Sequence, residues 1–158
     1  MAVDYFLKVD DIKGESKDKK KPDEILLQAW SFGASQSGTF GRGGGGAAGK
    51  VNLQDFSFSK EIDKASSTLY LRCCDGKHLK EAKLTCRKAG EDQQEYFTVT
   101  MKDIIVSSFS TSGAGEVPTE QVTFNFSEIS WLYKPQKADG TLDSGTPLGW
   151  NQAANAKV

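Results

Sequence analysis

The stretch EQVTFNFSEISWLYK, residues 120–134, changes its apolar face partway along. Its large apolar residues first occupy even positions and then odd positions: Val122, Phe124 and Phe126, followed by Ile129, Trp131 and Tyr133. Successive side chains of a β-strand point to opposite faces, so a slip of one residue is typical of a β-bulge. The stretch therefore predicts one long strand that bends from one sheet into another, with Phe124, Phe126 and Trp131 in the core.

A second stretch, KVNLQDFSFSK at residues 50–60, shows the same change. Val51 and Leu53 share one face, whereas Phe56 and Phe58 continue the apolar pattern on the other. The slip lies between Leu53 and Phe56, and both phenylalanines are expected in the core. Two long strands with a phase change favour a barrel or a tightly curled sandwich.

Four further stretches have the alternation or the β-branched content of strands: YFLKV at 5–9, EILLQAWSFGASQS at 24–37, EAKLTCRKA at 81–89 and EYFTVTMKDIIVSSFS at 95–110. In residues 24–37 the odd-numbered side chains shrink toward Gly33, while Trp30 and Phe32 occupy even positions. This predicts Trp30 and Phe32 in the core and an open face opposite them. Strands and helices do not alternate along the chain, which excludes a parallel α/β sheet.

One helix is expected, because apolar residues recur at spacings of three and four in a single stripe: Ile62, Ala65, Leu69 and Cys73. Asp63, Ser66 or Ser67 could cap its start, and Gly76 is placed to end it. The predicted fold class is mainly β, a curled two-sheet β-barrel or sandwich with one short α-helix on its side.

Length, charge and hydropathy limit the class of protein. The 158 residues suit one domain at 1–140, with 141–158 as a tail of the same domain or a segment ordered at subunit contacts. The formal net charge is -1, so no nucleic-acid partner is expected, and the basic run at residues 17–21 is interpreted as a solvated loop. No apolar run is long enough for membrane insertion. The acidic start MAVDYFLKVDD does not resemble a secretory signal, so we expect synthesis in the cytoplasm.

The reactive side chains are few. Cys73, Cys74 and Cys86 are an odd number with an adjacent pair, which does not suit a disulfide framework. Cys73 is expected to pack inward from the helix as a small apolar group. His78 is the only histidine, too few for the usual zinc site or a Ser-His-Asp triad. We expect no catalytic residue, no metal site and no cofactor.

The glycine-rich stretch FGRGGGGAAGKV, residues 40–51, contains a partial phosphate-loop motif from Gly44 to Lys50. A P-loop needs Ser or Thr after the lysine and a helix directly behind it. Here Val51 follows the lysine, and the next residues are predicted to form a strand, so nucleotide binding is not favoured. Two interpretations remain open: a flexible loop whose backbone contacts another surface, or an inert linker.

Five stretches, in this order along the chain, resemble the Hcp family, the haemolysin-coregulated inner-tube proteins of bacterial type VI secretion: GESKDK, AWSFGASQSG, GGGGAAGKVNLQDFSFSKEIDKAS, GKHLKEAKLTCRKAG and YKPQKADG. The resemblance runs from Met1 to about Gly140 and implies a curled β-barrel with one helix at its side. It also implies a homo-hexameric ring with a wide hole, stacked into a tube. Implied partners are a VgrG-type spike, a contractile sheath and secreted effectors carried in the lumen. The protein would leave the bacterial cytoplasm for the extracellular space or a target cell without a signal peptide.

The resemblance also suggests contact residues. The loop expected to reach a neighbouring ring comprises Gly41, Arg42, Gly43, Gly44, Gly45, Gly46 and Lys50. Gly90 and Lys157 are candidates for opposite faces of the ring. Ser31, with its small neighbours Ala29 and Gly33, is a candidate for the lumen, because a cargo channel favours small polar groups. An ordinary solvent-facing strand residue would show the same pattern.

Two other function classes compete with a tube subunit. The first is a β-sandwich module that binds carbohydrate or a cell surface through exposed aromatic residues such as Trp150. A monomer with glycan-dependent shifts would support that class. The second is a nucleotide enzyme that uses the glycine-rich loop. Replacing Lys50 by alanine would then abolish ATP binding.

Overall fold

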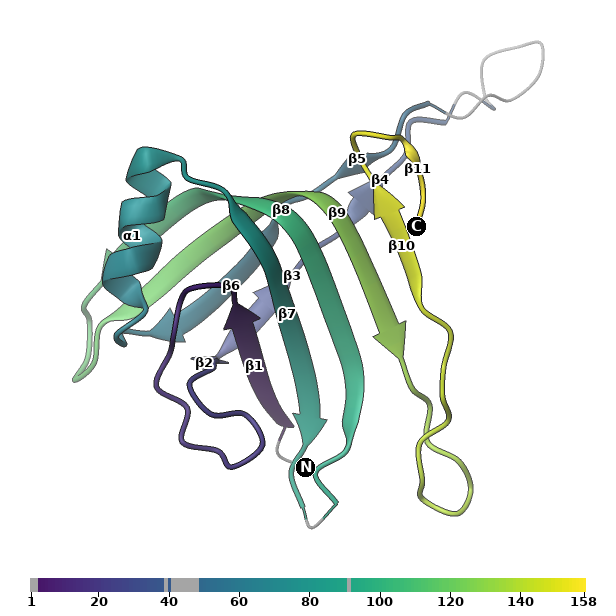
Figure 1. Cartoon of the computed structure of the whole chain (residues 1–158), viewed down its shortest axis with the longest axis horizontal. Coiled ribbons are helices and arrows are strands. Elements are labelled where there is room, and N and C mark those ends of the chain that lie inside the picture. Colours follow the sequence, from purple (N-terminus) through teal and green to yellow (C-terminus); the bar gives the residue numbers. More distant parts are fainter. Residues whose placement is uncertain (1–2, 39, 41–48, 91) are drawn as a thin grey trace.

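A computed structural model describes residues 3–38, 40, 49–90 and 92–158. Figure 1 shows a strongly curled sheet with a helix at one end. In chain order the elements are β1 (Val3–Val9), β2 (Ile25–Leu27), β3 (Ala29–Ser31), β4 (Ala34–Ser35), β5 (Asn52–Leu53), β6 (Phe56–Glu61), α1 (Ser66–Asp75), β7 (Leu79–Lys88), β8 (Glu95–Ser112), β9 (Thr119–Tyr133), β10 (Leu148–Asn151) and β11 (Ala156–Lys157). The mainly β class with one short helix is confirmed.

The long strand β9 organises the sheet. On one side it pairs with β8, which continues through β7 and β1 to β2. On its other side, the first part of β9 pairs with β6 and the last part with β10. Strand β6 pairs further with β3, β10 pairs with β11, and β4 and β5 form a separate ribbon.

The sheet is curled, because two of its terminal strands, β2 and β3, are consecutive in the chain but pair at different places in the sheet. β2 pairs with β1 and β3 pairs with β6, and only Gln28 lies between them. The Gln28 N–H donates a hydrogen bond to the Ser59 carbonyl over 2.8 Å. No ladder joins β2 to β6 in the part of the chain described, so the fold is a curled sheet rather than a closed hydrogen-bonded barrel.

The prediction of one extended strand over residues 24–37 is therefore wrong. The chain changes partner at Gln28, and its buried face changes there too. Ile25 is fully buried from β2, whereas Trp30 and Phe32 pack, half-buried, against the core from even positions. A single strand could not satisfy two partners on opposite sides of the curl, so the run divides into β2, β3 and β4.

The phase change in β9 is confirmed, but it is not a bulge at that point. Phe126 and Ile129 are both buried, and they lie opposite Ile104 and Met101 of β8 in an unbroken register. Asp103 of β8, which lies between these two pairs, has a positive φ of 54°, so the backbone of β8 departs there from a regular strand. A register shift occurs instead on β8 between Val106 and Ser108. The slip before Phe56 is a break between β5 and β6.

The helix ends as predicted and begins later than predicted. Gly76 has a φ of 66°, and its N–H donates to the Arg72 carbonyl over 3.0 Å. The N-cap residue is Ala65, whose side chain makes no capping hydrogen bond. The Asp63 carboxylate accepts a hydrogen bond from the Ala65 N–H at 2.9 Å, just outside the helix. Ile62 precedes this turn and is exposed, so its place on the buried stripe was wrong.

The core contains the four phenylalanines predicted there from the phases of β6 and β9: Phe56, Phe58, Phe124 and Phe126. Fully or almost fully buried members include Leu7, Ile25, Phe56, Phe58, Leu69, Leu84, Val99, Phe124 and Phe126. Cys73 packs half-buried against this core, and burial raises the pKa of the Cys86 thiol to about 11. Among the described residues no helix is both long and apolar enough to cross a membrane. The same residues contain no group of three side chains suited to a metal ion.

The basic run at residues 17–21 is anchored to the sheet through Asp18. Arg87 donates two hydrogen bonds to the Asp18 carboxylate, over 3.0 and 2.6 Å. The guanidinium also lies 4.7 Å from the centre of the Phe6 ring. The hydrogen bonds from Arg87 hold the pKa of the Asp18 carboxyl well below its usual range. The solvated-loop interpretation is therefore incomplete: Lys17, Lys19 and Lys20 are exposed, but Lys21 is part-buried and forms an ion pair with Glu95 over 2.8 Å.

Replacing Asp18 by asparagine is expected to lower the urea midpoint at pH 7 and to matter less as the pH falls below about 4. A carboxyl whose pKa is lowered by folding stabilises the native state above its unfolded pKa. That contribution disappears as the pH falls toward the folded pKa. Urea unfolding of both chains from pH 7 to 3 measures the difference. Asp92→Asn, at an exposed site, is the control, and a gap that stayed constant to pH 3 would contradict the prediction.

Candidate functional site

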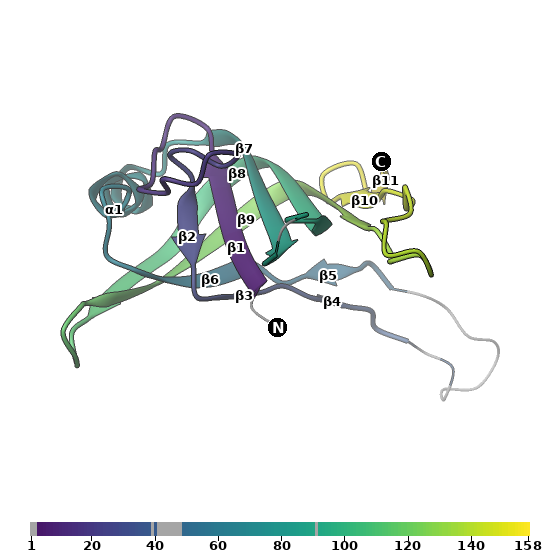
Figure 2. The same ribbon diagram turned by 90° about the horizontal axis from the view of Figure 1, so that it is seen from below.

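A continuous face of small polar residues covers the outer side of β3, β6, β9 and the end of β8. We call it the polar face, and its members are Ala29, Ser31, Ser57, Ser59, Ser108, Ser110, Gln121, Thr123 and Asn125. Alternation places them there, because the residues between them in the same strands, such as Phe58 and Phe124, fill the core. Figure 2 shows β3 and β6 along the lower side of the curled sheet.

Strand register assembles the polar face in rows. In one row Ser31 lies opposite Ser57, which lies opposite Thr123, which lies opposite Ser108. In the next row the members are Ala29, Ser59, Gln121 and Ser110. Each row crosses four strands, β3, β6, β9 and β8, so side chains of separate strands become one surface.

Hydrogen bonds within the polar face satisfy many of its groups. The Gln121 amide donates to the Ser57 hydroxyl over 2.7 Å. The hydroxyl of Thr123 lies 2.6 Å from those of Ser107 and Ser108. Asp55, at the border, accepts hydrogen bonds from Ser107 at 2.7 Å and Asn125 at 2.9 Å. The result is an ordered surface of hydroxyl and amide groups.

This arrangement does not resemble a nucleophile site. Ser107 donates a hydrogen bond to the carboxylate of Asp55, and no histidine or lysine of the described residues is hydrogen-bonded to this cluster. His78 follows α1 and is exposed, as the sequence interpretation of a polar residue after the helix predicts. A nucleophilic hydroxyl is usually activated by an adjacent base that a third group orients, and the described residues around Ser107 do not form that arrangement.

The three lumen candidates occupy different positions. Ala29 and Ser31 are exposed members of the polar face. Gly33 is half-buried beyond its end, where its carbonyl accepts a hydrogen bond from the Gln54 N–H over 2.8 Å. A Cβ at Gly33 would lie 2.9 Å from the Gln54 side-chain oxygen. The sequence analysis selected candidates only at the β3 edge of the polar face. The small or polar residues at every second position of β6 and β9 show the same alternation and could have been selected too.

Most of the predicted ring-contact loop lies outside the described residues, namely Gly41, Arg42, Gly43, Gly44, Gly45 and Gly46. Lys50 is described and is exposed before β5. Gly90 is exposed in the β7–β8 turn with a φ of 136°, and Lys157 is exposed on β11. Figure 1 places that turn and β11 at opposite edges of the molecule.

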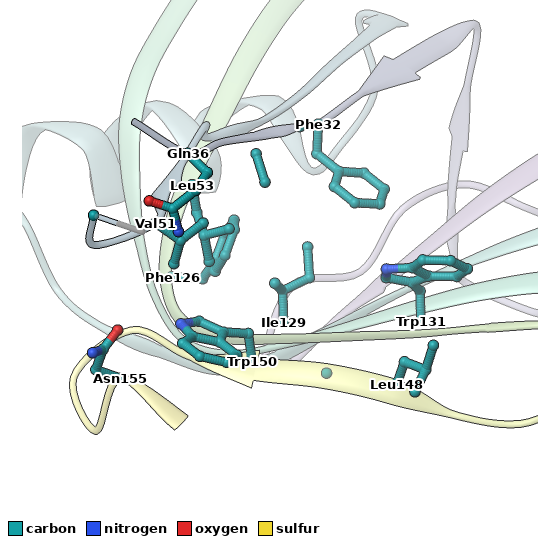
Figure 3. A pocket seen from close by; sticks show the side chains of 14 residues that line it. Phe32, Gln36, Val51, Leu53, Phe126, Ile129, Trp131, Leu148, Trp150 and Asn155 are labelled. Carbon is teal, nitrogen blue, oxygen red and sulfur yellow. The ribbon is translucent and has the colours of Figure 1, made fainter. Parts of the chain in front are cut away.

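An apolar groove of about 720 Å³ opens between the β4–β5 ribbon and strands β9 and β10. Figure 3 shows side chains from these elements pointing into it, and we define the apolar groove by Phe32, Leu53, Phe126, Trp131, Leu148 and Trp150. The core position predicted for Trp131 is wrong, because 40% of this residue is exposed. It lies beyond the part of β9 that β6 covers, so its inward face opens into the groove.

Comparison with known proteins decides the family. The family model described as "Type VI secretion system effector, Hcp" matches residues 6–133. The chain belongs to the Hcp family. Protein hcp1 of Pseudomonas aeruginosa is 53% identical to it over 162 residues, which cover 100% of both chains.

Solved Hcp structures share the fold. The crystal structure of Hcp1 from Salmonella typhimurium is 32% identical, with a TM-score of 0.80, over 99% of this chain and 100% of that chain. A structure described as a type six secretion system protein has a TM-score of 0.93 at 26% identity, with the same coverage. The resemblance seen in the sequence is thereby confirmed. Hcp proteins are secreted structural components of type VI secretion and are not a known enzyme family.

Proposed function

We propose that this Hcp chain is a structural tube subunit of a bacterial type VI secretion system. Six copies form a ring, rings stack into a tube, and the polar face lines the lumen, where effectors are carried. The observation that carries the proposal is the polar face, which is broad, ordered and nearly free of charge in a chain of this family.

The chemistry of the polar face suits a channel wall. Its side chains are short, so they leave the bore open. Many of its hydroxyl and amide groups already pair with one another, so a passing polypeptide meets few unpaired groups or exposed apolar surfaces that would hold it. Small polar groups still offer weak hydrogen bonds to a cargo.

Assembly follows from the symmetry of contacts. A head-to-tail contact that closes produces a ring, and a second contact that does not close produces a stack. The net charge of -1 allows like subunits to approach without strong repulsion. We further propose a VgrG-type spike at the tip, a contractile sheath outside and secreted effectors inside. On this proposal the tube moves from the bacterial cytoplasm to the extracellular space or a target cell.

The native mass tests the proposal directly. Light scattering after size exclusion, with negative-stain images of the same peak, should give six times the chain mass and ring-shaped particles. A monomer over a wide concentration range would contradict the tube subunit. Glycan-dependent shifts of such a monomer would favour the carbohydrate or cell-surface module instead.

Deleting Gly43 to Gly46 is expected to leave the free energy of unfolding within about 0.5 kcal/mol and to weaken stacking of rings. The proposed reason is that this loop reaches the neighbouring ring and that a loop four residues shorter does not. Urea unfolding measures the first effect, and the length of stacks in negative-stain images measures the second. Replacing the four glycines by Gly-Ser-Gly-Ser is the length-matched control and should stack normally. Normal stacking of the deletion variant would show that the loop is an inert linker.

A further inference from the structure

We propose that a pocket beside the loop between β1 and β2 binds the protonated amino end of an alkyl chain, as in a polyamine or a lysine side chain. Its volume is about 720 Å³, within the range of small-molecule sites. We call it the β1–β2 pocket and define it by Lys8, Val9, Ile12, Pro22, Glu24 and Thr68.

The carboxylate of Glu24 is the observation that points to a ligand. Only 8% of this residue is exposed, and it lines the β1–β2 pocket. No described residue donates a hydrogen bond to its carboxylate or forms an ion pair with it. A buried carboxylate without a partner is unfavourable, so a cation that enters the pocket would gain a strong contact.

Nearby lysines do not supply the missing partner. Burial raises the pKa of the Glu24 carboxyl, although the positive charges of Lys21, Lys8 and Lys83 act in the opposite direction. The ammonium of Lys21 is already paired with Glu95 over 2.8 Å. Loss of water therefore outweighs the attraction of these lysines, and an ammonium placed inside the pocket would restore the balance.

The other walls of the β1–β2 pocket suit an alkyl chain. Val9 and Ile12 are buried and line it together with Pro22. An ammonium at Glu24 can lay its methylene groups along these apolar side chains, as lysine side chains do on protein surfaces. A divalent metal ion would require several oxygen ligands, and the described residues contain no group of three side chains suited to one.

Backbone contacts form the pocket before any ligand binds. The Gly14 N–H donates to the Asp23 carbonyl over 2.8 Å, and the Ser16 N–H donates to the Glu24 carbonyl over 3.1 Å. A Cβ at Gly14 would lie 2.5 Å from the Glu24 carbonyl oxygen, so glycine permits this close approach. A site whose walls are already ordered loses little conformational entropy on binding.

The β1–β2 pocket is separate from the polar face. Figure 2 draws the loop between β1 and β2, in purple, on the upper side of the sheet, and β3 and β6 along the lower side. A ligand bound at Glu24 would therefore leave the polar face open. The inference goes beyond the proposed function, because it assigns a second binding site outside the proposed lumen.

Saturation-transfer NMR on the unmodified protein tests the site, with n-pentylamine as the probe and 1-pentanol as the uncharged control of the same chain length. Pentylamine should bind and pentanol should not. Glu24→Gln keeps the shape of the side chain and removes its charge, so it should weaken pentylamine binding at least about tenfold. Glu81→Gln, the same substitution at an exposed position outside the pocket, is the matched control and should bind normally.

A second variant tests the place of binding without changing the carboxylate. Thr68→Phe, on α1, should fill the β1–β2 pocket and weaken pentylamine binding by a similar factor. Circular dichroism checks that the variants fold, and the contrast between pentylamine and pentanol requires no variant at all. If pentylamine did not bind the unmodified protein, or bound folded Glu24→Gln equally well, the site would be overturned.

Two further probes distinguish the sources of the amine. Spermidine represents a free polyamine, and Nα-acetyl-lysine N-methylamide represents a lysine side chain of a protein. Binding of one probe alone identifies the source, and binding of both supports the shared chemistry. If neither probe bound, the proposed ligand class would be wrong. None of these outcomes alters the native mass or the ring-shaped particles by which the tube subunit is tested.

Discussion

Replacing Lys60 by methionine is expected to lower the free energy of unfolding by about 3–5 kcal/mol. The Lys60 side chain is fully buried, and its ammonium lies 2.6 Å from the Glu120 carboxylate and 2.8 Å from that of Asp63. It also donates to the Ser66 hydroxyl over 3.0 Å. The cluster joins β6, the start of α1 and the beginning of β9.

The expected loss comes mainly from what methionine leaves behind. Its side chain has a similar volume to lysine, but it cannot pair with the Glu120 carboxylate, of which only 2% is exposed. An isolated buried charge is far less favourable than a buried ion pair. The Ser66 hydroxyl would still donate to Glu120 over 2.5 Å, which compensates only in part.

Urea unfolding of the variants measures this effect. Lys64→Met is the control, because Lys64 is exposed and its one ion pair, with Asp23, spans 4.0 Å. It should change the free energy of unfolding by no more than about 0.5 kcal/mol. The double variant Lys60→Met with Glu120→Leu should be more stable than Lys60→Met alone, since it removes the unpaired carboxylate. If Lys60→Met lowered the free energy of unfolding by less than about 1 kcal/mol, the buried ion pair would not be a major contributor to stability.

Replacing Phe56 by alanine is expected to cost about 3–5 kcal/mol of folding stability. Phe56 is fully buried at the start of β6, directly behind the polar face. Its ring centre lies 6.0 Å from that of Phe58 and 6.3 Å from those of Trp30 and Phe32. Removing the ring leaves a cavity among aromatic side chains that come from separate segments of chain, so the surroundings cannot easily close around it.

Thermal and urea unfolding of Phe56→Ala test this prediction. The matched control is Phe40→Ala, the same substitution at a position 88% exposed, which should alter stability by no more than about 0.5 kcal/mol. If the two variants lost similar stability, the aromatic cluster around Phe56 would not be the anchor of β6. Assembly of Phe56→Ala below its unfolding temperature would further show whether the polar face depends on this anchor.

Several features of the fold could be predicted because they are local. Alternating apolar residues marked the strands, the change between Phe126 and Ile129 marked the bend, and Gly76 marked the end of the helix. Each depends on neighbours a few residues away. Lys60 and Glu120 also lie on the apolar faces of β6 and β9. A charged side chain is not expected to be buried unless a partner of opposite charge is known, and alternation alone does not identify that partner.

Other features depend on which strands become neighbours. The partner change at Gln28 split an apparently continuous strand, because β2 and β3 pair on opposite sides of the curl. Trp131 alternates like a core residue, yet it is exposed because β6 does not extend over that end of β9. For the candidate site, the sequence indicated only Ala29, Ser31 and Gly33.

The sequence by itself determined the strand content, the single helix of the described chain, the mid-strand phase change and the Hcp resemblance. Side-chain alternation, helix periodicity and the order of motifs are readable along one chain. Tertiary structure alone decided the rows of the polar face, the partner of Lys60 and the apolar groove. Those features require residues from distant segments to meet, and strand register and desolvation set which ones do.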